Sequence, residues 1–262
     1  MNVIGYEIGE IHAEAAMTSD IVLPLGLPFQ KLNDYVEIER RSMDTYRGMN
    51  RKYTPIQYDT VTGGPICGGR YVFDTWENVQ DYFRWTQEEL EFEPGVKFWD
   101  RAMFQQVDKH IWKVIGAHDF THVETHGVNR FERWHYTASA ADAKRILTEA
   151  WPHIREKAMQ AGLGSVWLLD QPDEKQIAIM TSNASAREDN DVEAAQRAVA
   201  KLAAMASLGE LLPASLGLTT AFNRTSMVFS TWLPLSRQKK GAPAINPMSP
   251  PLPFPDVPAQ EV

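Results

Sequence analysis

Cysteine is almost absent from this chain of 262 residues, because Cys67 is the only one. A single thiol excludes an intrachain disulfide framework, and it excludes zinc and iron–sulfur sites that need several cysteines. No motif of a thiol enzyme surrounds Cys67, so we interpret it as a buried strand residue.

Long basic runs are also missing. The formal net charge is −8, and Lys and Arg form no run longer than pairs such as Arg40-Arg41 and Lys239-Lys240. Because nucleic-acid phosphates attract clustered Lys and Arg, the sequence predicts no nucleic-acid partner.

No hydrophobic run is long enough to span a bilayer. The stretch IVLPLGLPF near the N-terminus is short and interrupted by prolines, and no basic region of a signal peptide precedes it. We therefore expect no membrane association and, by default, a cytoplasmic location.

Several common catalytic motifs are absent. The Gly-rich stretch TGGPICGGR lacks the Gly-Lys-Ser/Thr of a phosphate loop and is typical of a hairpin turn with a bulge. The chain also has no Gly-x-Ser-x-Gly elbow and no His-Glu-x-x-His. Apolar residues make up 44% and charged residues 23%, which is typical of a globular protein with a substantial core.

The second half of the chain shows the clearer pattern of strands and helices. Ser139 with Asp142 predicts a capping box at the start of a helix, and Pro152 predicts a kink or break near Trp151. The order is β-α-β-β-α-β, the ferredoxin-like split βαβ plan. The pattern predicts strands at 128–137, 164–170, 175–183 and 226–235, and helices at 139–162 and 189–208.

The first half can be interpreted on the same plan. Asp74 with Glu77 is placed to cap its second helix. The closing strand is either 96–104 or 113–120. The other predicted strands are 19–26, 52–60 and 66–74, and the helices are 28–48 and 75–90.

The predicted fold class is α+β, with two ferredoxin-like modules in tandem. We place the N-terminal module at 1–122 and the C-terminal module at 123–236. A Pro-rich extended tail without periodicity follows at 237–262.

One segment resembles a known family. The stretch CGGRYVFDTWENVQDYFRWTQEEL, followed by Gly95-Val96, resembles a small mono-oxygenase family of the dimeric α/β-barrel superfamily. The second half is similar to its antibiotic-biosynthesis monooxygenase and EthD-like members in the order of elements. The matching residues are Gly68, Gly69, Tyr71, Phe73, Asp74, Tyr82 and Thr86.

The resemblance implies that two sheets face each other as a barrel with a ligand cavity. Family members usually pair two chains for this, whereas a tandem copy builds the barrel within one chain, with antiparallel sheets; a homodimer remains possible. Relatives include cofactor-independent monooxygenases of aromatic polyketides, haem-degrading and haem-dependent proteins, and members without known activity. The fold alone does not choose among them.

Three histidines lie four residues apart in GAHDFTHVETHG, residues 116–127, at the seam between the modules. In an extended strand, four residues separate Cα atoms by roughly 13 Å, so one metal ion could not bind all three unless the segment were helical or looped. A polar wall of the cavity and a solvated connector are the other interpretations. We predict no metal site and assign His118, His122 and His126 to ligand binding.

The strand at 128–137 carries the predicted catalytic residues. Its charged residues fall on both faces, so some must enter an enclosed space, where charges are paired or functional. His135 could act as a general base, and Arg133 could hold a phenolate, enolate or carboxylate. An Arg–Glu pair with a core histidine is the structural alternative. We assign catalysis to His135, Arg133 and Tyr136, and ligand binding to Trp134, Arg130 and Tyr71 as well.

Aromatic residues favour a flat apolar ligand. Tryptophans recur on predicted elements throughout the chain, and aromatic-lined cavities suit such compounds. The leading hypothesis is a cofactor-independent monooxygenase acting on an aromatic or polycyclic compound. The alternatives are a haem protein, with His118, His122, His126 or His153 as axial ligand, and a non-catalytic small-molecule binding protein.

Overall fold

The computed structural model describes residues 8–27, 46–58, 65–122, 126–184 and 192–232. The predicted tail and most of the predicted helix at 28–48 lie outside these residues. The described chain forms an α+β fold with one large antiparallel sheet, as the sequence predicted.

The first half contributes four long strands to this sheet. Their spatial order is β7-β2-β4-β3, which is the 4-1-3-2 order of a ferredoxin-like unit. The two-residue strand β1 (Gly9–Glu10) pairs with the end of β7. The long strands are β2 (Ala15–Val22), β3 (Met49–Tyr58), β4 (Pro65–Phe73) and β7 (Gln106–Asp119).

The second half repeats this arrangement. Its spatial order is β11-β8-β10-β9, again 4-1-3-2. Its strands are β8 (His126–His135), β9 (Ser165–Gln171), β10 (Gln176–Ala184) and β11 (Thr219–Trp232).

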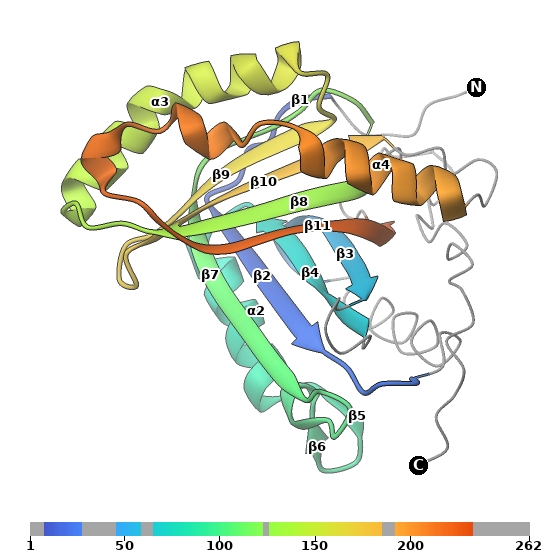
Figure 1. The fold of residues 1–262 in the computed structure, drawn as a ribbon. Coiled ribbons are helices and arrows are strands. Elements are labelled where there is room, and N and C mark those ends of the chain that lie inside the picture. Colours follow the sequence, from blue (N-terminus) through green and yellow to red (C-terminus); the bar gives the residue numbers. More distant parts are fainter. Residues whose placement is uncertain (1–7, 28–45, 59–64, 123–125, 185–191, 233–262) are drawn as a thin grey trace, which may run out of the picture.

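The two halves join into a ring of strands (Figure 1). β3 pairs with β11 on one side, and β7 pairs with β9 on the other, both antiparallel. The two edge strands of each half therefore pair with the edge strands of the other half. This pairing covers edges that would otherwise present unpaired backbone groups. One chain thus supplies both halves of the barrel.

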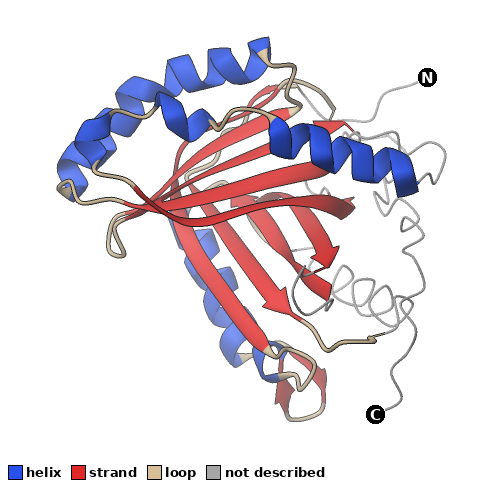
Figure 2. Cartoon of the chain, viewed as in Figure 1, coloured by secondary structure: helices blue, strands red, loops and turns tan. Residues whose placement is uncertain are grey.

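Helices cover the outside of the ring (Figure 2). Helix α2 (Trp76–Glu88) packs on the first half, and α3 (Ala140–Gln160) and α4 (Val192–Ala204) pack on the second. None of these described helices is long and apolar enough to cross a bilayer. The shorter elements are β5 (Glu91–Glu93), β6 (Val96–Lys97), η1 (Phe98–Asp100), η3 (Leu208–Leu211) and η4 (Ala214–Leu216).

Helix caps follow local hydrogen bonding. The backbone N–H of Asp142 donates to the Ser139 hydroxyl, which confirms the predicted cap of α3. The prediction for α2 was wrong by one residue, because Thr75 accepts from the Asn78 N–H while Asp74 accepts from the Asn78 side chain. Helix α3 also runs through Pro152 without a break.

The closing strand of the first half is the later of the two candidates. β7 extends the predicted 113–120 toward the N-terminus, whereas the stretch 96–104 forms β6 and the single turn η1. β11 likewise begins at Thr219 rather than at residue 226, because its first residues pair with the far end of β8.

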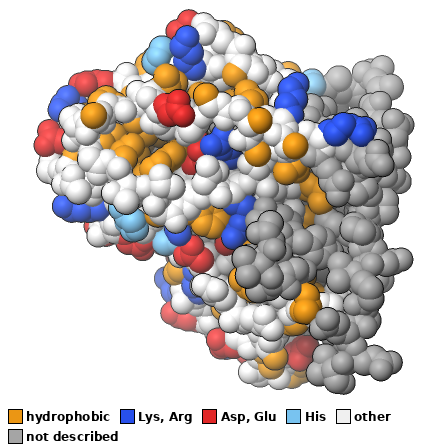
Figure 3. Space-filling model, viewed as in Figure 1, with side chains coloured by type: hydrophobic (Ala, Val, Ile, Leu, Met, Phe, Trp, Pro, Cys, Tyr) orange, Lys and Arg blue, Asp and Glu red, His pale blue; other side chains and the backbone are white. Residues whose placement is uncertain are grey.

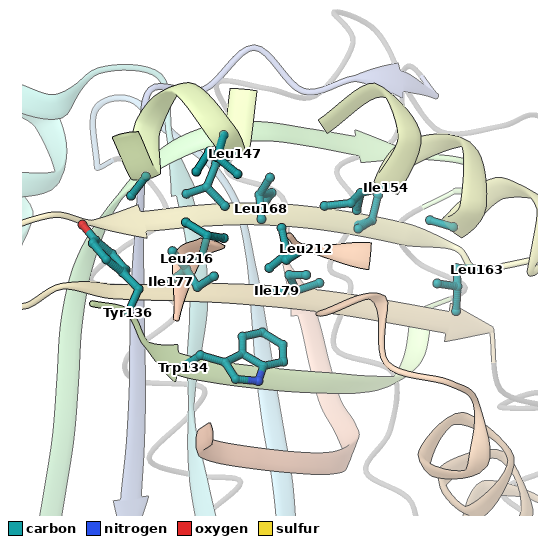
Figure 4. Close-up of a cluster of buried hydrophobic side chains, with 14 of the residues drawn as sticks. Trp134, Tyr136, Leu147, Ile154, Leu163, Leu168, Ile177, Ile179, Leu212 and Leu216 are labelled. Carbon is teal, nitrogen blue, oxygen red and sulfur yellow. The ribbon is translucent and has the colours of Figure 1, made fainter. Parts of the chain in front are cut away.

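Three clusters of buried hydrophobic side chains pack on the two faces of the sheet. One lies between α2 and the first half, and another lies beneath α3 and α4 on the second half (Figure 4). The third lies inside the ring and takes residues from both halves, among them Tyr53, Val72, Trp112, Phe131 and Trp167.

Candidate functional site

The barrel interior is occupied by side chains. Trp112, Trp167, Tyr53, Phe131 and Arg70 are among the largest fully buried side chains, and they lie on the inner faces of the strands. The expectation that the facing sheets enclose a ligand cavity stays a prediction, and this cluster of bulky side chains occupies part of the space inside the ring. The two pockets described below lie on the outer face of the sheet.

Strand β8 places its charged residues on both faces, as the sequence predicted. Phe131 and Arg133 face inward, opposite Met180 and Ala178 of the inner cluster. The alternate residues Arg130, Glu132 and Trp134 face outward toward the helices. The predicted site residues of β8 therefore lie in two environments, one inside the ring and the other beneath the helices.

Arg133 belongs to a polar cluster at one mouth of the barrel. Its Nη2 donates to Asp108 Oδ2 at 2.8 Å, and its Nη1 contacts His110 Nε2. His110 Nδ1 lies 2.9 Å from Glu174 Oε2. The hydrogen bond from His110, together with Arg133, lowers the pKa of Asp108 well below its ordinary value. This cluster links β7, β8 and the β9–β10 turn across the mouth.

The three predicted catalytic residues do not meet. His135 is exposed at the end of β8, on the same face as Arg133. Tyr136 is buried on the opposite face, in the cluster beneath α3. The common catalytic role of these residues stays a prediction.

Tyr136 lies near a buried carboxyl group instead. Burial raises the pKa of Asp170 to about 6, although the positive charges of Lys113 and Lys144 act to lower it. Burial also raises the pKa of Tyr136 to about 12, with the negative charge of Asp170 as the next cause. The pair lies on the outer face of the sheet, next to the β9–β10 turn that carries Glu174.

The three seam histidines are spread over different surroundings. His126 is fully buried, with Nδ1 2.9 Å from the Tyr53 hydroxyl and Nε2 3.0 Å from the Thr121 hydroxyl. Burial lowers the pKa of His126 to about 4, so the ring is neutral near pH 7. His118 faces outward against Phe120, and burial lowers its pKa as well.

No shared ligand site unites these histidines. His122 follows β7 in the connection to β8, and His126 opens β8. Within the described parts of the chain, no three His, Cys, Asp or Glu side chains are arranged to hold a metal ion. Tyr71 lies elsewhere again, buried between the first-half sheet and α2, with Lys52 over its ring.

The larger of the two pockets is an open groove of about 420 Å³ on the outer face of the second half. It lies over β8 and β11, beside the segment that follows α4. Figure 3 shows this side of the molecule, where hydrophobic and charged side chains are interspersed over the second half. Its lining residues are Arg130, Glu132, Trp134, Ser207, Gly209, Glu210, Leu218, Thr220, Phe222 and Asn223.

A buried ion pair lies in this outer groove. Arg130 Nη2 donates to Glu132 Oε1 at 2.6 Å, and only 3% of Glu132 is exposed. Arg130 also donates to the Met205 carbonyl oxygen at 2.7 Å and to Asn223 Oδ1 at 3.3 Å. Burial raises the pKa of Glu132 despite the hydrogen bond from Ser207 and the charge of Arg130. The pair is thus buried and held by several hydrogen bonds.

Trp134 forms an aromatic wall of the groove. The backbone of η3 packs directly on its indole, because a Cβ on Gly209 would lie 2.4 Å from Trp134 Cζ2. Sequence reasoning assigned Arg130 and Trp134 to ligand binding and considered the strand's glutamate, Glu132, only as the partner in a structural Arg–Glu pair, which the structure forms. The place of Glu132 two residues after Arg130, on the same strand face, was the available signal.

Haem does not fit this groove. The described lining has no His, Cys, Tyr or Met side chain that could bind iron axially. His153, one of the predicted axial ligands, is exposed on α3, and His126 has both ring nitrogens engaged by hydroxyl groups.

No family model matches the chain, and no curated protein matches its sequence. A candidate monooxygenase from Fusobacterium nucleatum subsp. nucleatum aligns over 83% of this chain and 93% of its own, with 7% identity and a TM-score of 0.51. An anthrone oxidase-like protein aligns over 86% and 95%, with 12% identity and a TM-score of 0.49. A candidate monooxygenase from Lactobacillus acidophilus NCFM aligns over 82% and 93%, with 11% identity and a TM-score of 0.48.

At these identities the likeness concerns the fold. The resemblance identified in the sequence is confirmed at that level by the Fusobacterium structure and by the strand order of both halves. The chain has a ferredoxin-like α/β-barrel fold, with both halves supplied by one polypeptide.

Proposed function

We propose that the outer groove binds a flat aromatic or polycyclic compound and that the chain oxidises it as a cofactor-independent monooxygenase. The observation that carries this proposal is the buried Arg130–Glu132 pair in a 420 Å³ groove beside the Trp134 indole. The volume lies in the range of small-molecule sites, and an indole face suits a planar ring system.

Glu132 is the proposed base. Its raised pKa makes it a better proton acceptor near neutral pH than an ordinary carboxylate. Before proton transfer, Glu132 neutralises Arg130. After transfer, the substrate anion takes over that role, so the groove keeps its charge balance while the proton moves.

The oxidation then needs only dioxygen. The deprotonated substrate carbon donates electrons to O₂ and forms a C–O bond, giving a hydroperoxide after protonation. Loss of water from that hydroperoxide leaves a carbonyl, so that CH₂ and O₂ become C=O and H₂O. Substrate carbon is oxidised and dioxygen is reduced, without a metal or an organic cofactor.

A non-catalytic binding protein is the second candidate. The observation in its favour is that Arg130 is already engaged by Glu132, by the Met205 carbonyl and by Asn223. A fully engaged guanidinium can hold the groove in shape without taking part in chemistry.

Blocking the groove tests the proposal. Thr220 is exposed and lines the groove, so Thr220→Trp should fill it, whereas Thr219→Trp on the neighbouring exposed position outside the lining is the matched control. Using anthrone and 1-naphthol as probes, we expect binding and oxygen uptake to be lost in the first variant and kept in the second.

The Glu132→Gln variant separates the two candidates. Oxygen uptake lost with probe binding retained supports catalysis by Glu132, and uptake retained at the wild-type rate would contradict it. Probe binding without oxygen uptake in the wild-type protein would favour the non-catalytic candidate.

A further inference from the structure

The outer groove carries one negative charge that no buried partner neutralises. Three of its lining side chains are charged, and these are Arg130, Glu132 and Glu210. Arg130 and Glu132 are buried and paired with each other. Glu210 is exposed, and no residue in the described part of the chain forms an ion pair with it. A ligand in the groove therefore meets a neutral pair and one free carboxylate.

Glu210 belongs to the segment that packs on the aromatic wall of the groove. It lies on η3 and directly follows Gly209, which contacts the Trp134 indole. The face of an indole attracts cations as well as flat rings, because the ring quadrupole is negative there. This part of the groove thus has two features that favour positive charge.

The two carboxylates of the groove repel each other. Burial is the main cause of the raised pKa of Glu132, and the negative charge of Glu210 raises it further. A positively charged group placed near both carboxylates would offset this repulsion. The other polar side chains of the lining, Ser207, Thr220 and Asn223, carry no charge that could do so.

The smaller pocket is not a site for an aromatic ligand. It flanks the Arg130–Glu132 pair on the side of β10 and has a volume of about 30 Å³, whereas a single water molecule already needs about 10–15 Å³ of such space. This volume excludes an aromatic ring, so the ligand is recognised by the groove.

We propose that the groove selects flat aromatic compounds that carry a positively charged group, such as a protonated alkylamine attached to the ring. This inference rests on the proposed function of the groove and names the substrate class of that site. The ring stacks on Trp134, the positive group lies against Glu210, and the carbon that loses its proton lies at Glu132. A positive charge near that carbon also makes it more acidic, because it stabilises the carbanion.

Three naphthalene probes of similar size test the charge preference. 1-Naphthylmethylamine is a cation at pH 7, 1-naphthalenemethanol is neutral and 1-naphthoate is an anion. At low ionic strength we expect the cation to bind about threefold to tenfold more tightly than the alcohol, and the anion to bind most weakly. In about 1 M NaCl the preference should shrink, because exposed charges are screened. Equal Kd values for the three probes at low ionic strength, or tightest binding of the anion, would overturn the proposal.

Substitutions of Glu210 assign the preference to its charge. Glu210→Gln should reduce the preference for the cation over the alcohol about twofold to fivefold and leave the Kd of the alcohol unchanged. Glu210→Lys should shift the preference toward the anion. Glu88→Gln removes the same charge from an exposed position on α2, outside the groove lining, and should keep the wild-type preference. A preference for the cation that survives undiminished in Glu210→Lys would overturn the proposal.

The two proposals fail differently. Equal affinity for three bound probes refutes the charge preference alone, because the groove still binds aromatic compounds. Selective binding of the cation without oxygen uptake from anthrone refutes the proposed oxidation and leaves the ligand class in place. Failure to bind any of the three probes refutes the groove as an aromatic site, and the charge preference with it.

Discussion

Replacing Asp170 with Asn should make the protein more stable at alkaline pH. Asp170 is 2% exposed, and burial raises its pKa from the ordinary 3.8 to about 6. A carboxyl group whose folded pKa exceeds its unfolded pKa opposes folding once it ionises. The Asp170→Asn substitution keeps the shape of the side chain and removes its charge.

The size of the expected stabilisation follows from the pKa shift of Asp170. Two pKa units correspond to about 3 kcal/mol at most, and attraction to Lys113 and Lys144 is already included in the net value. We expect Asp170→Asn to raise the free energy of unfolding by about 1 to 3 kcal/mol at pH 8. For a chain of this size, that corresponds to about 2 to 4 °C in Tm for each kcal/mol.

The stabilisation by Asp170→Asn should depend on pH. Below about pH 3 both the folded and the unfolded protein hold the proton, so the advantage of the amide should vanish. It should grow between about pH 3 and 7 and remain constant above about pH 7. Urea unfolding at pH 4, 6 and 8 measures this, with the exposed turn variant Asp173→Asn as the control. A loss of stability at pH 8 would refute the reasoning, because it would mean that Asp170 is stabilised in its charged form.

Three further predictions concern the groove and the seam. Arg130→Met should destabilise the fold by about 3 to 5 kcal/mol, because it leaves Glu132 buried without its counter-charge, and Arg130→Met with Glu132→Leu should recover most of that loss in urea unfolding. His126→Phe should lower the free energy of unfolding by about 1 to 3 kcal/mol at pH 8, because two hydrogen bonds are lost. This loss should shrink toward pH 5, because at that pH only the unfolded wild-type protein takes up a proton on the ring. A loss that grew as the pH fell would contradict this. Gly209→Ala should lower Tm and shift Trp134 fluorescence, because the new Cβ meets the indole, and unchanged fluorescence would count against that contact.

The order of elements could be predicted from the sequence because local signals determine it. Apolar periodicity placed α2, α3 and most of the strands within a few residues, although β7 and β11 begin well before the predicted residues, and the Ser139 cap was visible in the sequence. The division of β8 into two charged faces was also apparent, because strand alternation depends only on position.

Contacts between distant segments could not be predicted in the same way. Arg133 reaches Asp108 only because the ring closes through β7 and β9, which no local pattern encodes. The hydrophobic cluster inside the ring depends on where Trp112 and Trp167 point once the halves meet. The groove depends on the path of the chain after α4, which packs on Trp134 through Gly209.

The location of ligand binding is the central claim, and indole N–H resonances report it directly. Trp134 lines the outer groove, whereas Trp112 and Trp167 are fully buried inside the barrel. Titration with an aromatic probe should shift the Trp134 indole resonance and leave those of Trp112 and Trp167 in place. Shifts of Trp112 or Trp167 with Trp134 unmoved would place the ligand inside the barrel and contradict the account.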